Sequence, residues 1–189
     1  MDNIIIGCDE VGTGSAVGCL CVAGVRAHKD WTLEGLNDSK KLSEKKRNLM
    51  RDQLLKLAED QQITFCIVEK SHQDIDRLSL GVALKQAYLE LFNKLYCDKS
   101  TIIVDGNLNF GNQKFTIICL PKADTKIPTV MAASILAKTH RDSIIKAYHQ
   151  QYPVYGLESN VGYLTANHIS AIKKHGLSDI HRKSYKFNF

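Results

Sequence analysis

The chain has 189 residues, of which 44% are hydrophobic and 24% are charged, and its formal net charge is +5. This length fits one domain, and the hydrophobic share is large enough for a buried core, which excludes a disordered chain. No run approaches the roughly 20 apolar residues of a membrane-spanning helix. Residues 1–6 lack the basic segment of a secretory signal. We therefore expect a cytoplasmic protein that does not associate with membranes.

The six cysteines lie mostly within apolar, strand-like runs, where a free cysteine behaves as a small hydrophobic residue. The chain contains no C-x-x-C pair and no histidine pair at zinc-finger spacing. We expect reduced cysteines in the core, with neither a zinc site nor a disulfide framework. They are Cys8, Cys19, Cys21, Cys66, Cys97 and Cys119.

Residues 3–8, 16–25 and 63–69 are predicted strands, because each segment is apolar or β-branched and is bounded by Gly, Asp or Ser. The first two flank a glycine-rich loop, which predicts an antiparallel hairpin. Residues 43–60 lie between the second and third strands. They place apolar side chains at helical spacing after Ser43, a suitable N-cap, and so predict a helix.

The second half of the chain alternates between helical and extended patterns. A helix is predicted over 81–96, followed by strands over 101–104 and 115–120. Helices are predicted over 129–150 and 165–175, the second ended by Gly176. This order of elements indicates an α/β fold with a five-stranded mixed sheet flanked by helices.

Basic residues gather in two places, although the overall excess of positive charge is small. Such clusters are usually solvated helix faces, and they indicate nucleic-acid binding only where they flank a site that needs a polyanion. The first comprises Lys40, Lys41, Lys45, Lys46 and Arg47, and the second Lys173, Lys174, Arg182, Lys183 and Lys186.

Four carboxylates follow strands or precede a helix. Asp9 and Glu10 end the strand in "IIIGCDE", Asp105 ends "TIIVD", and Asp124 precedes the long helix in "LPKADTKIPT". A single aspartate after a strand is usually a turn residue. If the two strands are neighbours, however, their terminal acids converge at one edge of the sheet.

Converging carboxylates repel one another, and a divalent cation removes this cost. Oxygen ligands without nearby His or Cys suit Mg²⁺ or Mn²⁺, and Mg²⁺ typically takes one or two carboxylates per ion. The four acids are therefore expected to hold two ions, the arrangement used in phosphodiester cleavage. Asp9 and Glu10 can reach one site only if their strand bends or ends there, which Gly12 and Gly14 permit.

The stretch "DEVGTGS" also resembles the first phosphate loop of actin-like ATPases and sugar kinases. Those proteins close two duplicated domains over a nucleotide, whereas this chain is short and has no internal repeat. It also lacks the common glycine-rich nucleotide-binding motifs. A phosphotransferase of this type is the weaker alternative.

Five segments together resemble ribonuclease HII, the type 2 ribonuclease H family, over nearly the whole chain. They are "GCDEVGTGS", "NDSKKLSEKKR", "IIVDGN", "KADTKIPTVMAASILAKTHRD" and "NVGYLTANHISAIKKHGLSDIHRKSY". The resemblance implies a ribonuclease H-like fold. It also implies cleavage of RNA in RNA/DNA hybrids and at ribonucleotides embedded in duplex DNA, leaving 3′-hydroxyl and 5′-phosphate ends.

The same resemblance assigns roles to individual residues. It implies that Asp9, Glu10, Asp105 and Asp124 are the metal-binding and catalytic acids, with Mg²⁺ or Mn²⁺ as cofactor. It implies that Tyr163 packs against the sugar beside the scissile ribonucleotide. Lys40 is implied as a phosphate contact, and residues 12–14 as a loop that reads the 2′-hydroxyl through backbone N–H groups. It further implies a single domain over 1–189 that acts as a monomer, with 155–189 as a C-terminal helical substrate-binding extension.

One position departs from the family pattern. The family usually has Gly-Arg-Gly where this chain has Gly12, Thr13 and Gly14, and proline where Ser15 stands. Thr13 removes a cation beside the substrate phosphates, so we expect weaker binding and a blunted preference for single ribonucleotides. A catalytically weak hybrid-binding protein is the alternative from another class, although all four acids are present.

The long helix contributes two further expectations. Lys138 and Arg141 are three residues apart, so we expect them to share a helix face and to neutralise the acids or contact phosphate. The small residues Ala132, Ala133, Ser134 and Ala137 are expected to let this helix lie close to the sheet. His181 and Arg182 are expected to be structural or to face phosphate.

Overall fold

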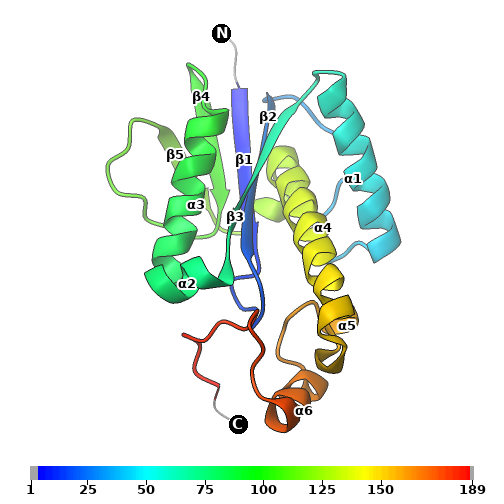
Figure 1. Ribbon diagram of the computed structural model, residues 1–189. Coiled ribbons are helices and arrows are strands. Elements are labelled where there is room, and N and C mark those ends of the chain that lie inside the picture. The colour runs from blue at the N-terminus through cyan, green and yellow to red at the C-terminus, as the bar shows by residue number, and fades with distance from the viewer. Residues whose placement is uncertain (1–3, 188–189) are drawn as a thin grey trace.

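A computed structural model describes residues 4–187 of the chain. Its centre is a single five-stranded sheet with the order β3-β2-β1-β4-β5 (Figure 1). β1 pairs antiparallel with β2, and β2 pairs antiparallel with β3, whereas the β1–β4 and β4–β5 pairs are parallel. The mixed sheet is confirmed, with strands β1 Ile4–Val11, β2 Leu20–His28, β3 Thr64–Lys70, β4 Ser100–Asp105 and β5 Thr116–Leu120.

Helices cover both faces of the sheet (Figure 1). α2 and α3 lie on one face, and α1 and α4 lie on the other. The C-terminal elements, including α5 and α6, lie beyond the lower end of α4. The helices are α1 Glu44–Glu59, α2 His72–Leu78, α3 Leu80–Leu95, α4 Pro128–Gln151, α5 Leu157–Asn160 and α6 Ala166–His175, with short 3₁₀ turns η1 Ala123–Thr125 and η2 Pro153–Tyr155.

Local sequence signals set several helix ends. The Ser43 hydroxyl accepts a hydrogen bond from the Lys46 N–H at the start of α1, and Thr165 caps α6 in the same way. Gly176 ends α6 with a positive φ of 77°, which glycine adopts at low cost. α2 was not predicted, although Ser71 and Asp74 form a capping box at its start.

Two hydrophobic cores lie on the two faces of the sheet. Tyr88, Leu91 and Phe92 of α3 pack on even-numbered residues of β1 such as Ile6 and Cys8. On the other face the small residues of α4 are fully buried, as expected, and α4 runs so close to β1 that a Cβ at Gly7 would lie 2.4 Å from Thr129. This close approach brings the middle of α4 onto the end of β1.

The predicted second strand was too long at its start, because residues 12–19 form a loop and β2 begins at Leu20. Residues 16–18 of this loop instead pair with the C-terminal segment. Val17 forms a bridge with His181, the Gly18 N–H donates to the Ile180 carbonyl, and the Arg182 N–H donates to the Ala16 carbonyl. The C-terminal segment is thereby fixed to the loop that joins β1 to β2.

A third apolar cluster joins these C-terminal elements to the loop and to α4, and includes Val17, Ile145, Tyr155 and Ile180. Among residues 4–187, no helix is both long and apolar enough to cross a membrane. Cys8, Cys19 and Cys21 are buried, and the other three cysteines are partly buried. Residue 3 of the predicted first strand lies outside the described residues.

Candidate active site

The four acids predicted from strand ends come from three adjacent elements. β1 and β4 are parallel neighbours whose pairing ends at Cys8 and Val104, so Asp9 and Asp105 occupy equivalent positions one step further on. Neighbouring strands lie about 4.8 Å apart. Asp124 lies in η1, and the Asp105 carboxylate accepts a 2.7 Å hydrogen bond from the Ala123 N–H beside it. The sheet therefore brings the acids together at one edge.

We expected Asp9 and Glu10 to reach one site only if β1 bends or ends there, and β1 does not end there. β1 continues to Val11, and both acids are paired with β2, so their side chains leave the strand on opposite faces. Asp9 lies beside Ser134 of α4 in the same cavity wall, whereas Glu10 accepts a hydrogen bond from the buried Tyr88 hydroxyl of α3. β1 continues past the end of β4, so the edge of β1 that faces β4 has no paired strand at Asp9 and Glu10. Asp9 on one face of the sheet and Glu10 on the other therefore both lie beside this unpaired edge.

Burial and mutual repulsion shape the electrostatics of these acids. Burial is the main reason that the pKa of Asp9 rises to about 7, and the neighbouring Glu10 charge adds to it. Burial likewise raises the pKa of Glu10, with a further contribution from Asp105. The negative charges are therefore costly to assemble without a cation.

The carboxylates provide a hard, oxygen-only donor set of the kind that suits Mg²⁺ or Mn²⁺. Within residues 4–187, no group of three or more His, Cys, Asp or Glu residues is arranged to hold a metal ion. Several carboxylate oxygens are instead committed to hydrogen bonds, such as Asp9 with the Glu10 N–H at 2.8 Å. Mg²⁺ usually takes one or two carboxylates together with water and substrate phosphate, so the donor set still fits such an ion.

Lys40 lies on the solvent side of the acids. Its ammonium group is 3.3 Å from the Asp124 carboxylate, and its side chain is 78% exposed. Partial burial lowers the pKa of Lys40, but the neighbouring acids Asp124, Asp9 and Asp38 together outweigh this effect, so the pKa is raised. The turn that carries Lys40 is tied to α4 by a 2.9 Å hydrogen bond between the Ser39 and Ser134 hydroxyls. Lys40 is therefore a fixed, accessible cation at the edge of the acid cluster.

A cavity of about 230 Å³ opens beside these residues. Asp9, Glu10, Lys40 and Tyr163 line it, so four of the predicted site residues share one surface hollow. Tyr163 lies half-buried just before α6, and a Cβ built on Gly14 would lie 3.9 Å from its ring. The remaining lining residues are Val11, Ser39, Ser134 and Lys138.

The three residues of the glycine loop differ in exposure. Gly12 is buried with a φ of 90°, and a Cβ there would lie 2.3 Å from Arg141 Nε. Thr13 is partly buried and its carbonyl faces the C-terminal segment, whereas Gly14 is exposed beside Tyr163. Gly12 therefore shapes the loop from inside, and Gly14 is the residue that a substrate can reach.

The expectation for Lys138 and Arg141 was wrong in part. Arg141 is completely buried and donates hydrogen bonds to the carbonyls of Cys19 and Val161, each at 3.0 Å, so it contacts neither the acids nor solvent. It ties the β1–β2 loop to the segment before Tyr163. Lys138 pairs with Asp142 at 3.0 Å and lines the cavity.

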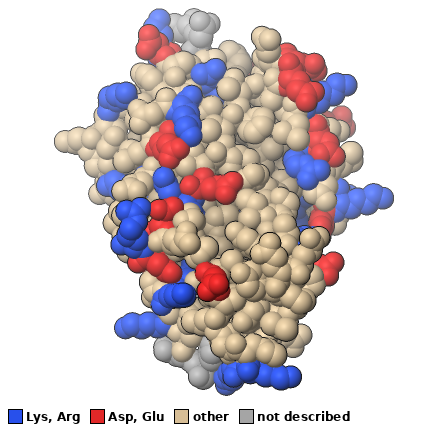
Figure 2. Space-filling view, viewed as in Figure 1, with Lys and Arg blue, Asp and Glu red and all other residues tan. Residues whose placement is uncertain are grey.

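The two predicted basic clusters are not purely surface features either. Arg182 is completely buried and donates to the Gly18 carbonyl, and Arg47 donates to the Ser39 carbonyl at 2.8 Å. Figure 2 shows lysine or arginine side chains near the lower, α6 end, and charges of both signs interspersed over the rest of this face. The basic residues thus divide between loop-fixing arginines and exposed lysines.

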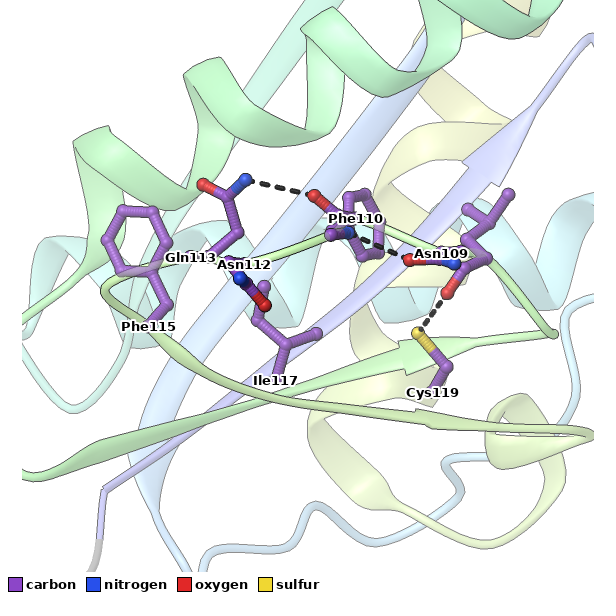
Figure 3. A pocket seen from close by; sticks show the side chains of 9 residues that line it. Asn109, Phe110, Asn112, Gln113, Phe115, Ile117 and Cys119 are labelled. Atoms are coloured by element: carbon purple, nitrogen blue, oxygen red, sulfur yellow. Dashed lines mark hydrogen bonds between the residues drawn. The ribbon is translucent and has the colours of Figure 1, made fainter.

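A larger cavity of about 580 Å³ lies between the β4–β5 loop and β5 (Figure 3). None of the four acids lines it. Its polar groups are largely paired within the loop itself, as in the bonds from Cys119 to the Leu108 carbonyl and from Gln113 to the Phe110 carbonyl. This arrangement packs the loop and adds nothing to the acid cluster.

Sequence comparison decides the family. The family model described as Ribonuclease HII matches residues 6–188. The chain belongs to the ribonuclease HII family. A curated Ribonuclease HII of Francisella tularensis subsp. novicida is 42% identical over 183 residues, covering 97% of this chain and 96% of that protein. Ribonucleases of this family are metal-dependent endoribonucleases, so the chain is an enzyme of this class.

Solved structures show the same fold. The ribonuclease HII of a PCNA complex from Archaeoglobus fulgidus superposes with a TM-score of 0.81 at 24% identity, covering 98% of this chain and 96% of that one. The ribonuclease H2 of Pyrococcus horikoshii gives 0.78 at 23%, covering 97% and 94%. A Bst-RNase HIII in complex with Mn²⁺ gives 0.66 at 19%, covering 93% and 63%. The ribonuclease H-like fold is therefore confirmed.

Two residues of the site were missed in the sequence. Tyr88 sits in the apolar stripe of α3, and Ser134 among the small residues of α4, so both patterns predict packing only. A tyrosine hydroxyl or a serine on a buried face needs a hydrogen-bond partner. That requirement was the available signal, and in this fold the Tyr88 hydroxyl is paired with Glu10 and the Ser134 hydroxyl with Ser39.

Proposed function

We propose that this ribonuclease hydrolyses the RNA strand of RNA/DNA hybrids and DNA duplexes at embedded ribonucleotides, using Asp9, Glu10, Asp105 and Asp124 as its metal-binding acids. The observation that carries this proposal is the convergence of acids from β1, β4 and η1 beside a cavity lined by Lys40 and Tyr163. A phosphotransferase of the actin-like type closes two duplicated domains over its nucleotide, whereas residues 4–187 form one domain around a single five-stranded sheet.

Mg²⁺ or Mn²⁺ held by these acids would activate a water molecule and neutralise charge on the scissile phosphate. The chain's own residues prepare the site for this chemistry. Tyr88 holds the Glu10 carboxylate, and the Glu10 N–H donates to the Asp9 carboxylate at 2.8 Å, so that neither side chain has to be ordered when substrate arrives. The exposed ammonium of Lys40 is placed to bind a substrate phosphate beside Asp124.

The glycine loop over residues 12–14 and Tyr163 would distinguish RNA from DNA. Only RNA carries a 2′-hydroxyl, and a protein can distinguish RNA from DNA by contacting it. Gly14 is exposed and unencumbered beside Tyr163, so a ribose can approach its backbone closely. The Tyr163 ring forms the adjacent wall of the cavity and can pack against the sugar. The C-terminal elements over 155–189 carry Tyr163 and would form a substrate-binding extension of a single domain.

A cleavage assay tests the proposal. The substrates are a DNA duplex with one ribonucleotide and a longer RNA/DNA hybrid, each with Mg²⁺, Mn²⁺ or EDTA. We expect metal-dependent cuts that leave 3′-hydroxyl and 5′-phosphate ends. Asp105→Asn is expected to abolish cleavage while hybrid binding persists, and Asp98→Asn, at an exposed position, is the matched control. Binding without any metal-dependent cut would favour a hybrid-binding protein instead.

A further inference from the structure

Two completely buried histidines lie behind Tyr163. His168 of α6 places Nδ1 3.0 Å from the Tyr163 carbonyl oxygen and Nε2 3.2 Å from His181 Nε2. On its other side, His181 Nδ1 lies 2.9 Å from the Ser178 backbone nitrogen and 2.7 Å from the Ser178 hydroxyl oxygen, and the hydroxyl can donate to it as the N–H does. The four groups form one continuous chain of hydrogen bonds from Ser178 to Tyr163.

Only one arrangement of protons satisfies this chain. A backbone N–H can only donate, so His181 Nδ1 accepts from Ser178 and its ring proton is on Nε2. His181 then donates to His168 Nε2, which leaves the His168 proton on Nδ1. A carbonyl oxygen can only accept, and the Tyr163 carbonyl receives this proton. Both rings are neutral, and each has a defined tautomer.

The surroundings keep the pair in place. The ring of Tyr155 packs edge-on against His181 with centroids 4.8 Å apart, and its hydroxyl donates to the Gly176 carbonyl at 2.9 Å. Burial lowers the pKa of both histidines, which favours the neutral rings that the proton arrangement requires. The pair is therefore a rigid, uncharged support.

The Tyr163 carbonyl also accepts a hydrogen bond from the Thr165 N–H at 2.9 Å, and the segment that carries Tyr163 is anchored on its other side as well. Arg141 binds the Val161 carbonyl at 3.0 Å, and Ser15 binds the Gly162 carbonyl at 2.9 Å. Both of these contacts come from the β1–β2 loop or α4, whereas the contact from His168 comes from α6. The Tyr163 carbonyl is thus the point at which a side chain of α6 contacts the segment that carries the Tyr163 ring.

We propose that His168 and His181 are positioning residues for the ribonuclease reaction, acting through the Tyr163 carbonyl to hold the Tyr163 ring at the ribose site. This inference rests on the proposed role of Tyr163 in substrate packing. The inference adds that the tautomer of His168 determines how well the Tyr163 ring is placed. His181 and Ser178 set this tautomer.

Nuclear magnetic resonance tests the arrangement in the intact wild-type protein. Correlation of each imidazole nitrogen with the ring carbon-bound protons shows which nitrogen carries the N–H proton. At neutral pH we expect the proton of His168 on Nδ1 and that of His181 on Nε2. A proton on Nε2 of His168, or a charged ring, would overturn the proposal regardless of any variant's stability.

Kinetics test the functional consequence. In His168→Asn the amide nitrogen replaces Nδ1 as a donor to the Tyr163 carbonyl, whereas His168→Leu keeps bulk and removes the donor; both lose the contact with His181. We expect His168→Leu to lower kcat/KM on a hybrid about tenfold, mainly through KM, which corresponds to one lost hydrogen bond. His168→Asn should restore most of that loss. Equal losses in both variants would refute positioning through the carbonyl.

A double-mutant cycle with Tyr163→Ala separates this inference from the proposed function. If His168 acts through Tyr163, His168→Leu should cost little further activity once the ring is gone. An undiminished cost in that background would overturn the inference. If Tyr163→Ala alone leaves KM and kcat unchanged, the proposed role of Tyr163 fails, and the inference fails with it.

Discussion

The hydroxyl of Tyr185 donates a hydrogen bond to the main-chain carbonyl of Thr13, 2.6 Å away and 172 residues earlier in the chain. Arg182 donates to the same carbonyl at 3.3 Å and to the Tyr185 hydroxyl at 2.7 Å. Asp76 of α2 holds the intervening segment by accepting from the N–H groups of Lys183 and Ser184. In a trans peptide the C=O and the next N–H point in opposite directions. Fixing the Thr13 carbonyl inward therefore directs the Gly14 N–H outward.

Tyr185→Phe tests whether this contact serves the substrate loop. The substitution removes two hydrogen bonds, the one donated to Thr13 and the one accepted from the buried Arg182, so it is expected to lower the free energy of unfolding by about 2 kcal/mol or more. It is also expected to raise KM for a hybrid several-fold, because the Gly14 N–H is less well oriented. Urea unfolding and steady-state kinetics provide the two measurements. Tyr96→Phe is the control, since the Tyr96 hydroxyl makes no hydrogen bond within the part of the chain that the structure describes. A stability loss with an unchanged KM would make the contact purely structural.

Gly12 and Gly14 should respond differently to the same substitution. Gly12→Ala places a methyl group 2.3 Å from Arg141 Nε at a φ of 90°, and is expected to destabilise the fold by about 2 kcal/mol or more. Gly14→Ala has open space and no positive φ, so the melting temperature should stay near that of the wild type.

The activity of the two glycine variants completes this comparison. Gly14→Ala is expected to lower cleavage of ribonucleotide-containing substrates, because the methyl group stands where the ribose must approach. The measurements are thermal unfolding and initial rates on both substrates. A Gly14→Ala enzyme with wild-type rates would show that the substrate does not contact this backbone.

Thr13→Arg should restore a cation at the loop. Each additional phosphate contact steepens the dependence of log binding constant on log salt concentration by about 0.9 for a duplex. We expect tighter binding of both substrates at low salt and a steeper salt slope by about that amount. Thr13→Gln, which is similar in reach but uncharged, is the matched control. Equal slopes for the two variants would mean that position 13 does not face a phosphate.

The acids of the site could be predicted from sequence because their signal is local. An apolar strand that ends in a carboxylate is visible in "IIIGCDE" and "TIIVD", and parallel neighbours bring such ends together. The faces on which Asp9 and Glu10 project could not be predicted, because that depended on where β1 stops. The two glycines after them suggested an earlier end than the observed one at Val11.

The supporting residues could not be predicted, because their partners are distant in sequence. Arg141 has the helical spacing of an exposed cation relative to Lys138, yet its partner Cys19 lies 122 positions away. Tyr88 lies 78 positions from Glu10. Helical periodicity identifies which side chains share a face, but not which loop covers that face. Only the packed fold shows that α4 is covered by the β1–β2 loop at this point.

Acid sensitivity of the fold follows from the buried histidine pair. Burial lowers the pKa of His181 to about 4 and also lowers the pKa of His168, whereas an unfolded histidine titrates near about 6.5. Between these values the unfolded chain binds more protons than the folded protein, so the contribution of each ring to stability is complete above pH 6.5. For His181 it is lost as the pH falls toward 4, at up to about 1.4 kcal/mol per pH unit, and His168 adds a loss of the same sign.

Urea unfolding of the wild type and of His181→Gln, measured from pH 7.5 to 4.5, tests this expectation. The free energy of unfolding of the wild type should fall more steeply over this range than that of the variant, because the glutamine side chain takes up no proton. His28→Gln is the control, since it removes a surface histidine whose side chain is 53% exposed and leaves the buried pair intact; the loss of slope in His181→Gln should exceed any change in this variant. If His181→Gln instead retains the wild-type slope, protonation of this buried pair does not drive the acid response.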